Sequence, residues 1–147
     1  MMYDVITVGA ATRDVFLRSR GIQVIRDEAF STGEGECFAL RSKIDVDEIV
    51  FETGGGATNA AVTFARQGFR TAFVGKIGDR DARGREILAA LRQEKVATTL
   101  VSTDHQKSTA YSVLLLTARG ERTALVYRGA SADFYPRDFA WTKIRAG

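Results

Sequence analysis

The chain has 147 residues, of which 45% are hydrophobic and 27% are charged, a composition typical of one soluble globular domain. The net charge is +3, but the basic residues are scattered rather than clustered with aromatic residues, which argues against a nucleic-acid-binding protein. No apolar run reaches the length of a membrane span, and one cysteine with one histidine excludes an intrachain disulfide and argues against a Cys/His zinc site.

The first part of the chain indicates a strand followed by a polar excursion. Residues 5–8 are mostly β-branched and run into Gly9, which predicts a short buried strand, and Asp14 follows it. Residues 18–53 are polar, contain glycines and alternate in short pieces, so we expect an antiparallel excursion with one polar face. Its strand candidates are residues 37–40 and 48–51.

Three consecutive glycines, Gly54, Gly55 and Gly56, follow the last of these candidates and precede a stretch with helical character. A strand that runs into glycines and then into a helix can present backbone N–H groups to a ligand. Glycine is costly in backbone entropy, which suggests that something comes close to the main chain here. The glycines alone fit a tight strand-to-helix turn equally well.

Helix and strand patterns alternate after these glycines. The apolar spacing predicts a helix that Gly68 ends, a buried strand over 71–75 and a second helix over 82–94. The residues expected on the buried faces of the two helices are Ala60, Ala61, Phe64, Ala65, Ile87, Leu88 and Leu91.

The last part of the chain predicts a short strand, a hairpin and a helix. The strand is expected over 98–101, and the hairpin joins strands over 111–117 and 123–127. Pro136 lies near the start of a last helix, where its missing N–H costs nothing. The apolar residues expected in this helix are Phe139, Trp141 and Ile144.

This alternation predicts an α/β fold in which helices cover a parallel sheet. Residues 18–53 and the hairpin over 111–127 do not fit that scheme, and they could pair as a small sheet at one edge. Ligands of open α/β sheets bind beyond the carboxyl ends of the strands. Asp14 and the glycines at 54–56 both follow strands, so they could meet there.

Six short motifs occur in a fixed order along the chain. They are GAATRD at 9–14, GGGATNAA at 54–61, FVGKIGD at 73–79 followed by GRE at 84–86, and GER at 120–122 with GAS at 129–131. This ordered set resembles the N-terminal region of the PfkB/ribokinase family of carbohydrate kinases, over nearly the whole chain. The first motif resembles the family's first strand with its substrate aspartate, and the last two resemble its lid hairpin and the segment after it.

The resemblance implies a ribokinase-like α/β fold, with a layered parallel sheet, helices and a small antiparallel β lid. Residues 1–147 would be the N-terminal part of a single domain, incomplete, with lid segments at about 18–53 and 109–128. Kinases of this family transfer the γ-phosphoryl group of ATP to a substrate hydroxyl, with Mg²⁺. The lid would cover the substrate and exclude water.

The resemblance also implies a substrate site, carried over residue by residue. Asp14 would accept hydrogen bonds from sugar or nucleoside hydroxyls, because a carboxylate makes strong charge-assisted bonds. Gly54 and Gly55 would offer backbone N–H groups, Asn59 its side-chain amide, and Tyr111 a contact from the lid strand. Asp14 as a surface or capping aspartate and Asn59 as a cap of the first helical turn are the alternatives.

The sequence departs from the family in three ways. Position 56 is glycine where some members carry lysine, and the interval from Gly78 to Gly84 is slightly longer than usual. The family is also longer, and its catalytic aspartate lies in a Gly-x-Gly-Asp motif that this sequence lacks. We therefore expect a substrate-binding half with no catalytic residue and no metal ligand, which binds ATP and Mg²⁺ poorly and is inactive alone.

Two other functions are compatible with the residues. A Rossmann-type dinucleotide-binding domain would use Gly54 and Gly56 as the first glycines of G-x-G-x-x-G, although Asn59 stands at the third position. A non-catalytic interaction protein would form a homodimer through the lid. In each case we expect a cytoplasmic protein without a membrane or nucleic-acid partner. A pentose, a hexose, a ketodeoxy sugar acid and a nucleoside are all compatible with the substrate site.

Overall fold

The computed structural model describes residues 2–145, which divide into two compact units. The first unit comprises the residues up to 13, residues 53–111 and the residues from 126 onward. The second unit comprises residues 14–52 and 112–125. These ranges lie close to the expected lid segments, 18–53 and 109–128, and a role of the second unit as a lid stays a prediction.

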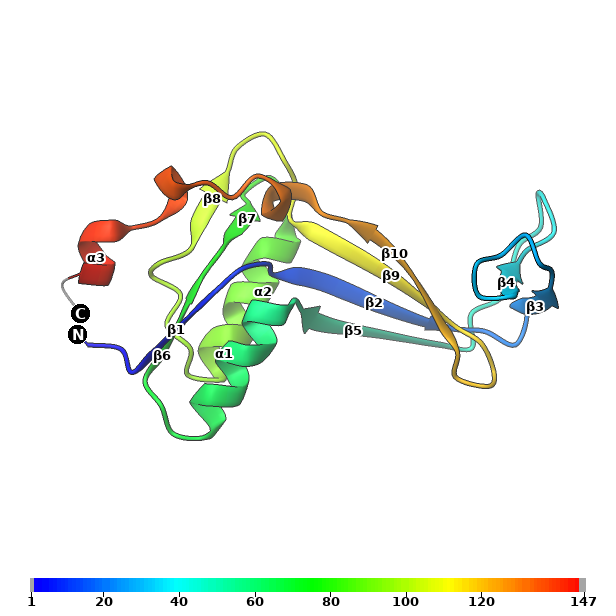
Figure 1. Cartoon of the computed structure of the whole chain (residues 1–147), viewed down its shortest axis with the longest axis horizontal. Coiled ribbons are helices and arrows are strands. Elements are labelled where there is room, and N and C mark those ends of the chain that lie inside the picture. Colours follow the sequence, from blue (N-terminus) through cyan, green and yellow to red (C-terminus); the bar gives the residue numbers. More distant parts are fainter. Residues whose placement is uncertain (1, 146–147) are drawn as a thin grey trace. The chain divides into compact units, whose positions relative to one another are not determined.

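Parallel strand pairs form the centre of the first unit (Figure 1). Strand β1 (Val5–Val8) pairs with β6 (Thr71–Val74), and β7 (Lys76–Gly78) pairs with β8 (Ser102–Asp104). Helix α1 (Gly56–Arg66) packs against β1 and β6, and α2 (Ala82–Gln93) packs against β7. The parallel pairing and the helices confirm the predicted α/β class.

The helix signals in the sequence are largely confirmed. Gly68 has φ +93°, and its N–H bonds to the carbonyl of Ala65 at 3.0 Å, so it ends α1 as predicted. Ile87 and Leu91 of α2 are buried in the core. The prediction for Phe64 is wrong, because this side chain is 36% exposed. The buried stripe of α1 runs through Ala57, Thr58, Ala61, Val62 and Ala65 instead.

Two predictions for the last part of the first unit need correction. The strand expected over 98–101 is wrong: the strand in this region is β8, at residues 102–104. These residues pair with the backbone of β7, a strand that the sequence did not predict. The single last helix is divided into a 3₁₀ turn, η2 (Pro136–Asp138), and the short α3 (Trp141–Arg145). Pro136 occupies the first position of η2, where the missing N–H costs nothing.

A four-stranded sheet contributes most of the second unit. Its order is β10 (Arg122–Tyr127), β9 (Ala110–Leu116), β2 (Thr12–Arg18) and β5 (Glu48–Gly54). The predicted hairpin is therefore confirmed, and it shares a sheet with one of the strands expected within 18–53. Strand β2, which the sequence did not predict, lies between β9 of the hairpin and β5.

A short antiparallel ladder completes the second unit. It joins β3 (Gln23–Arg26) and β4 (Glu34–Cys37). The strand expected over 37–40 is wrong, because the pairing ends where Cys37 meets Gln23 and residues 38–40 have no strand partner.

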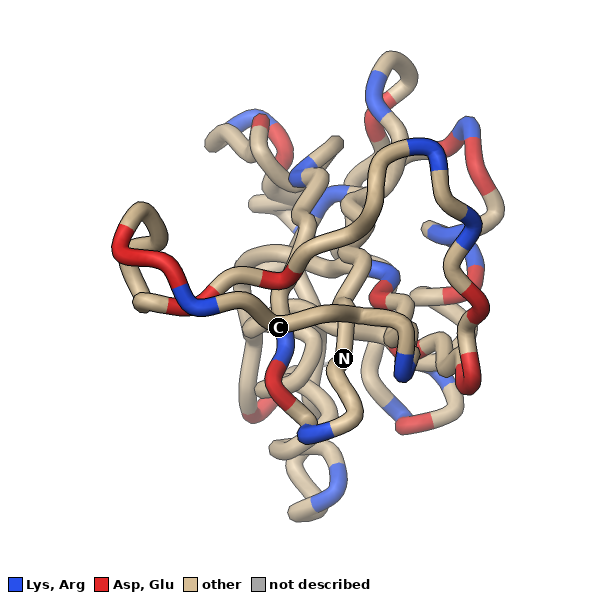
Figure 2. The backbone as a smooth tube through the Cα atoms, turned by 90° about the vertical axis from the view of Figure 1, so that its right-hand side faces the viewer, with Lys and Arg blue, Asp and Glu red and all other residues tan. Residues whose placement is uncertain are grey.

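Charged residues of both signs are interspersed along the backbone of residues 2–145 (Figure 2). The described helices include none that combines the length and the apolar character needed to cross a bilayer.

Candidate functional site

The glycines between β5 and α1 have different structural roles. Gly55 is the N-cap of α1, with φ +110° and ψ +136°, a backbone conformation that residues other than glycine rarely adopt. A Cβ atom at this position would lie 2.3 Å from the carbonyl oxygen of Ala10. Gly56 has no heavy atom within 4 Å of such a Cβ. The close approach that the sequence suggested is thus made by the chain itself at Gly55.

The N-terminus of α1 remains available to an acceptor. No side chain caps it, and the first turn contains no acidic residue. The hydroxyl of Thr58 donates to the carbonyls of Gly54 and Gly55, at 2.7 and 2.8 Å, and so does not satisfy the N–H groups of the first turn. Asn59 is exposed within this helix, so its interpretation as the cap is wrong. Gly54, Gly55 and Asn59 therefore gather at one helix end.

Asp14 lies on β2, in the second unit. Its Oδ1 atom is buried and makes no hydrogen bond within the described residues. A buried carboxylate oxygen without a donor costs free energy, and a group that donates a hydroxyl or N–H would satisfy it. This property distinguishes Asp14 from an ordinary surface or capping aspartate.

Tyr111 belongs to β9 and contacts the start of α2. The guanidinium of Arg83 lies 4.5 Å from the centre of the Tyr111 ring, within the range of a cation–π interaction. Arg13, at the beginning of β2, pairs with Glu86 of the same helix at 3.0 Å. The start of α2 thus carries arginine contacts that the sequence did not indicate.

The acidic residues before α2 have structural roles. Asp81 caps the helix and accepts the N–H groups of Gly84 and Thr109, at 3.3 and 2.8 Å. Burial raises the pKa of Asp81, but these N–H groups more than offset that effect, so the pKa lies below its ordinary value. Asp79 pairs with His105.

A buried lysine is the main feature that the sequence analysis missed. Lys76 is 7% exposed, and its Nζ lies 3.3 Å from Asp104, 3.2 Å from Asp138 and 3.1 Å from the carbonyl oxygen of Asp133. Burial lowers the pKa of Lys76, but the two carboxylates more than offset this and raise the pKa above its ordinary value. The signal was a lysine within a buried strand run, FVGKI at 73–77.

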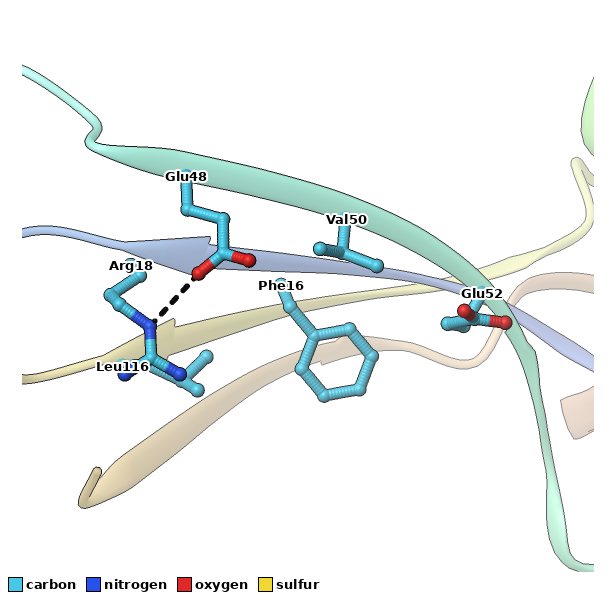
Figure 3. A pocket seen from close by; sticks show the side chains of 6 residues that line it. All are labelled: Phe16, Arg18, Glu48, Val50, Glu52 and Leu116. Atoms are coloured by element: carbon cyan, nitrogen blue, oxygen red, sulfur yellow. Dashed lines mark ion pairs between the residues drawn. The ribbon is translucent and has the colours of Figure 1, made fainter.

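The second unit contains a pocket of about 280 Å³ on its four-stranded sheet (Figure 3). Arg18 and Glu48 form an ion pair at 3.1 Å at one end of it. The lining residues come from β2, β5 and β9 and are Phe16, Arg18, Glu48, Val50, Glu52 and Leu116. No local pattern in the sequence predicts this pocket, because its walls come from three strands that are distant in the chain.

Comparisons with known proteins are consistent across sequence and structure. The model of the family "pfkB family carbohydrate kinase" matches residues 4–146. The chain is 35% identical to probable fructokinase-4 of Arabidopsis thaliana, over 65% of this chain and 29% of that protein. It is 44% identical to fructokinase-1 of Oryza sativa subsp. japonica, over 54% of this chain and 24% of that protein.

Solved structures support the fold. A ribokinase of Arabidopsis thaliana, complexed with ribose and ATP, superposes with a TM-score of 0.66 at 24% identity, over 88% of this chain and 37% of that chain. A fructokinase of Halothermothrix orenii superposes with a TM-score of 0.62 at 23% identity, over 87% of this chain and 38% of that chain. The chain thus spans less than half the length of these proteins.

Proposed function

The chain belongs to the pfkB family of carbohydrate kinases, and on that premise we propose that it is the substrate-binding half of an ATP-dependent sugar or nucleoside kinase. In the complete reaction, a hydroxyl of the substrate would attack the γ-phosphorus of ATP. ADP would leave, and the hydroxyl proton would pass to a catalytic aspartate outside this sequence. The part of the reaction assigned to this chain is to hold the acceptor substrate.

The observation that carries the proposal is the buried Oδ1 of Asp14, which has no donor in the described structure. A substrate hydroxyl would supply that donor and form a charge-assisted hydrogen bond. The N–H groups of Gly54 and Gly55 and the amide of Asn59 would bind further hydroxyls. Because Ala10 already explains why position 55 is glycine, this contact depends on the N–H groups of the helix end.

In this proposal, the remaining parts of the reaction belong to residues other than those that the structure describes. The sequence has no Gly-x-Gly-Asp motif, and the described residues contain no group of three or more His, Cys, Asp or Glu side chains that could hold a metal ion. The proposal assigns ATP and Mg²⁺ to a further part of a complete enzyme. No catalytic step follows from the residues present, and the proposal includes that the chain is inactive alone.

Calorimetric titration of the 147-residue chain with ribose and fructose tests this proposal. Asp14→Asn removes the charge with little change in shape, and we expect it to weaken sugar binding by about 1.5–3 kcal/mol. The matched control is Asp45→Asn, an exposed position in the same unit, which should leave binding unchanged.

The same variant also separates a functional from a structural aspartate. Because Oδ1 of Asp14 has no donor in the described structure, Asp14→Asn should leave the free energy of unfolding unchanged or raise it. If the variant unfolds more easily and binds sugar normally, the proposed role of Asp14 is wrong.

An interaction protein is the second candidate, and the edges of the four-stranded sheet favour it. Strand β10 is exposed throughout, and Leu125 and Val126 are each more than half exposed. Edge strands with exposed apolar residues pair readily with another chain. We propose a homodimer through this sheet. Sedimentation of Leu125→Lys should show a shift towards monomer, and an unchanged association state would contradict it.

The position of the glycines argues against a dinucleotide-binding domain. The glycines of a G-x-G-x-x-G motif follow a strand of the parallel sheet. Here they follow β5, an edge strand of the four-stranded sheet, whereas the parallel pair consists of β1 and β6.

A further inference from the structure

The short antiparallel ladder of the second unit has one face with charged side chains. Val24 of β3 lies opposite Glu36 of β4, and Arg26 lies opposite Glu34. Cross-strand partners and alternate residues of a strand point to the same side of a ladder, so these four side chains share one face. Arg26 and Glu34 form an ion pair at 2.9 Å. The arginine of this face is thus already paired with a glutamate other than Glu36.

Glu36 is a carboxylate without a compensating group. Both of its side-chain oxygen atoms are buried, and neither has a hydrogen-bond donor or an ion-pair partner within residues 2–145. A buried carboxylate without a donor costs free energy. The glutamate side chain has three rotatable bonds, so the carboxylate can turn towards a donor that enters an adjacent space.

That space is a pocket of about 300 Å³, which lies at the lower end of the volumes of small-molecule sites. Its lining residues come from the ladder, from the loop between β9 and β10 and from the start of β10, and they are Val24, Thr32, Glu34, Gly35, Glu36, Glu121, Arg122 and Thr123. All of them belong to the second unit. Neither Asp14 nor Gly54–Gly56 lines this pocket, so it is separate from the proposed substrate site.

The charges of the lining favour a ligand with two positive groups. Glu121 accepts a hydrogen bond from the hydroxyl of Thr117, which is the main reason why the pKa of Glu121 lies below its ordinary value. Glu36 and Glu121 therefore offer two acceptors, whereas Arg122 is exposed and is the one cation among the lining residues. Val24 is 39% exposed and offers an apolar wall for an alkyl chain. The described residues contain no group of three or more His, Cys, Asp or Glu side chains that could hold a metal ion, which favours an organic cation.

We propose that this pocket binds a short aliphatic diamine, with one ammonium group on Glu36, the other on Glu121 and the alkyl chain against Val24. An ammonium group donates three hydrogen bonds and carries the charge that an unpaired carboxylate requires. A neutral ligand would leave the charge of Glu36 uncompensated. The diamine links the β3–β4 ladder to the hairpin of β9 and β10.

Calorimetric titration of the 147-residue chain with butane-1,4-diamine tests this proposal, at an ionic strength that NaCl holds constant. We expect saturable binding of one diamine per chain. Glu36→Gln retains the shape of the side chain and should weaken binding about tenfold or more, because a hydrogen bond to a charged group contributes about that factor. Glu28→Gln is the matched control, at an exposed glutamate of the same unit outside the pocket, and should leave binding unchanged.

Nα-acetyl-lysine amide distinguishes a free diamine from a lysine side chain of another protein, because it carries one ammonium group. We expect this compound to bind at least about tenfold more weakly than the diamine, and Glu121→Gln should abolish the difference. Equal affinity of the parent chain for the two compounds would overturn the assignment of a diamine.

Arg122→Gln separates a ligand site from an internal ion pair. Under the proposal, removal of this positive charge tightens diamine binding about two- to fivefold and leaves the urea midpoint unchanged. Saturating diamine also raises the urea midpoint of the parent chain but not that of Glu36→Gln. If Arg122 turns to pair with Glu36 instead, Arg122→Gln and Glu36→Gln lower the urea midpoint by similar amounts and the diamine has no effect on it. That result, or the lack of saturable binding, would overturn the proposal.

Discussion

Gly55→Ala and Gly56→Ala form a matched pair, because the two glycines are adjacent and their surroundings differ. At position 55 the backbone has φ +110°, and a conformation that is sparsely populated by other residues costs about 1–3 kcal/mol. The new methyl group would also lie 2.3 Å from the carbonyl oxygen of Ala10 and 3.1 Å from the Cα of Ala11. Backbone atoms cannot rotate away, so the chain must shift, at a further cost of about 1–3 kcal/mol.

We expect Gly55→Ala to lower the free energy of unfolding by about 3–4 kcal/mol, which corresponds to a fall in Tm of roughly 10 °C. Gly56 is the first residue of α1, and a methyl group there meets no atom within 4 Å. Gly56→Ala should therefore leave stability unchanged or raise it by about 0.4–1 kcal/mol, since alanine restricts the unfolded chain.

The assay for both variants is urea unfolding, followed by far-UV circular dichroism and by the fluorescence of Trp141, the one tryptophan of the chain. The two midpoints are compared at equal m-values, so that only stability differs. A Gly55→Ala variant within about 0.5 kcal/mol of the parent would refute the close approach of residues 10 and 55. Equal destabilisation by both variants would refute it as well.

Three further predictions concern the charged groups of the first unit. Lys76→Met should lower stability by about 3 kcal/mol, because the partly buried carboxylates of Asp104 and Asp138 lose their cation. Lys43→Met, at an exposed position, should change stability by less than about 0.5 kcal/mol, and urea unfolding followed by Trp141 fluorescence measures both variants. The pKa of Asp104 is about 2 instead of its ordinary 3.8, mainly because of the backbone N–H groups that it accepts. Its stabilising contribution is therefore full above about pH 4 and is lost as the pH falls through 2, so a urea midpoint that does not fall between pH 5 and pH 2.5 would contradict the assignment. Asp81→Ala removes a helix cap and should cost about 1–2 kcal/mol in thermal unfolding, whereas Asp81→Asn, which retains a capping oxygen, should cost less.

Some features of the structure could be predicted from sequence signals that lie within a few residues of each other. Gly68 ends α1 because the chain turns there with a positive φ, which glycine adopts without strain. A glycine after an apolar helical pattern can be recognised in the sequence. Ile87 and Leu91 show the helical period of α2, and residues 71–74 form a buried strand from their composition alone. The ordered motifs likewise predicted the family, because they carry the local backbone geometry of the fold.

Other features depend on segments that are distant in the sequence. The glycine at 55 is explained by the backbone of Ala10, and the position of β8 by the backbone of β7. Phe64 has the spacing of a core residue, but the side of α1 that faces β1 and β6 excludes it. No local pattern contains this information, because it depends on which element packs against which.

The candidate site divides in the same way. The sequence by itself determined the residue types, namely an aspartate after the first strand and glycines before a helix. Only the tertiary structure decided that Oδ1 of Asp14 is buried without a donor and that Lys76 is enclosed by two aspartates. It also placed an apolar pocket on the strand of Asp14. Burial and pairing of charges follow from the three-dimensional neighbours of a side chain, which the order of residues does not specify.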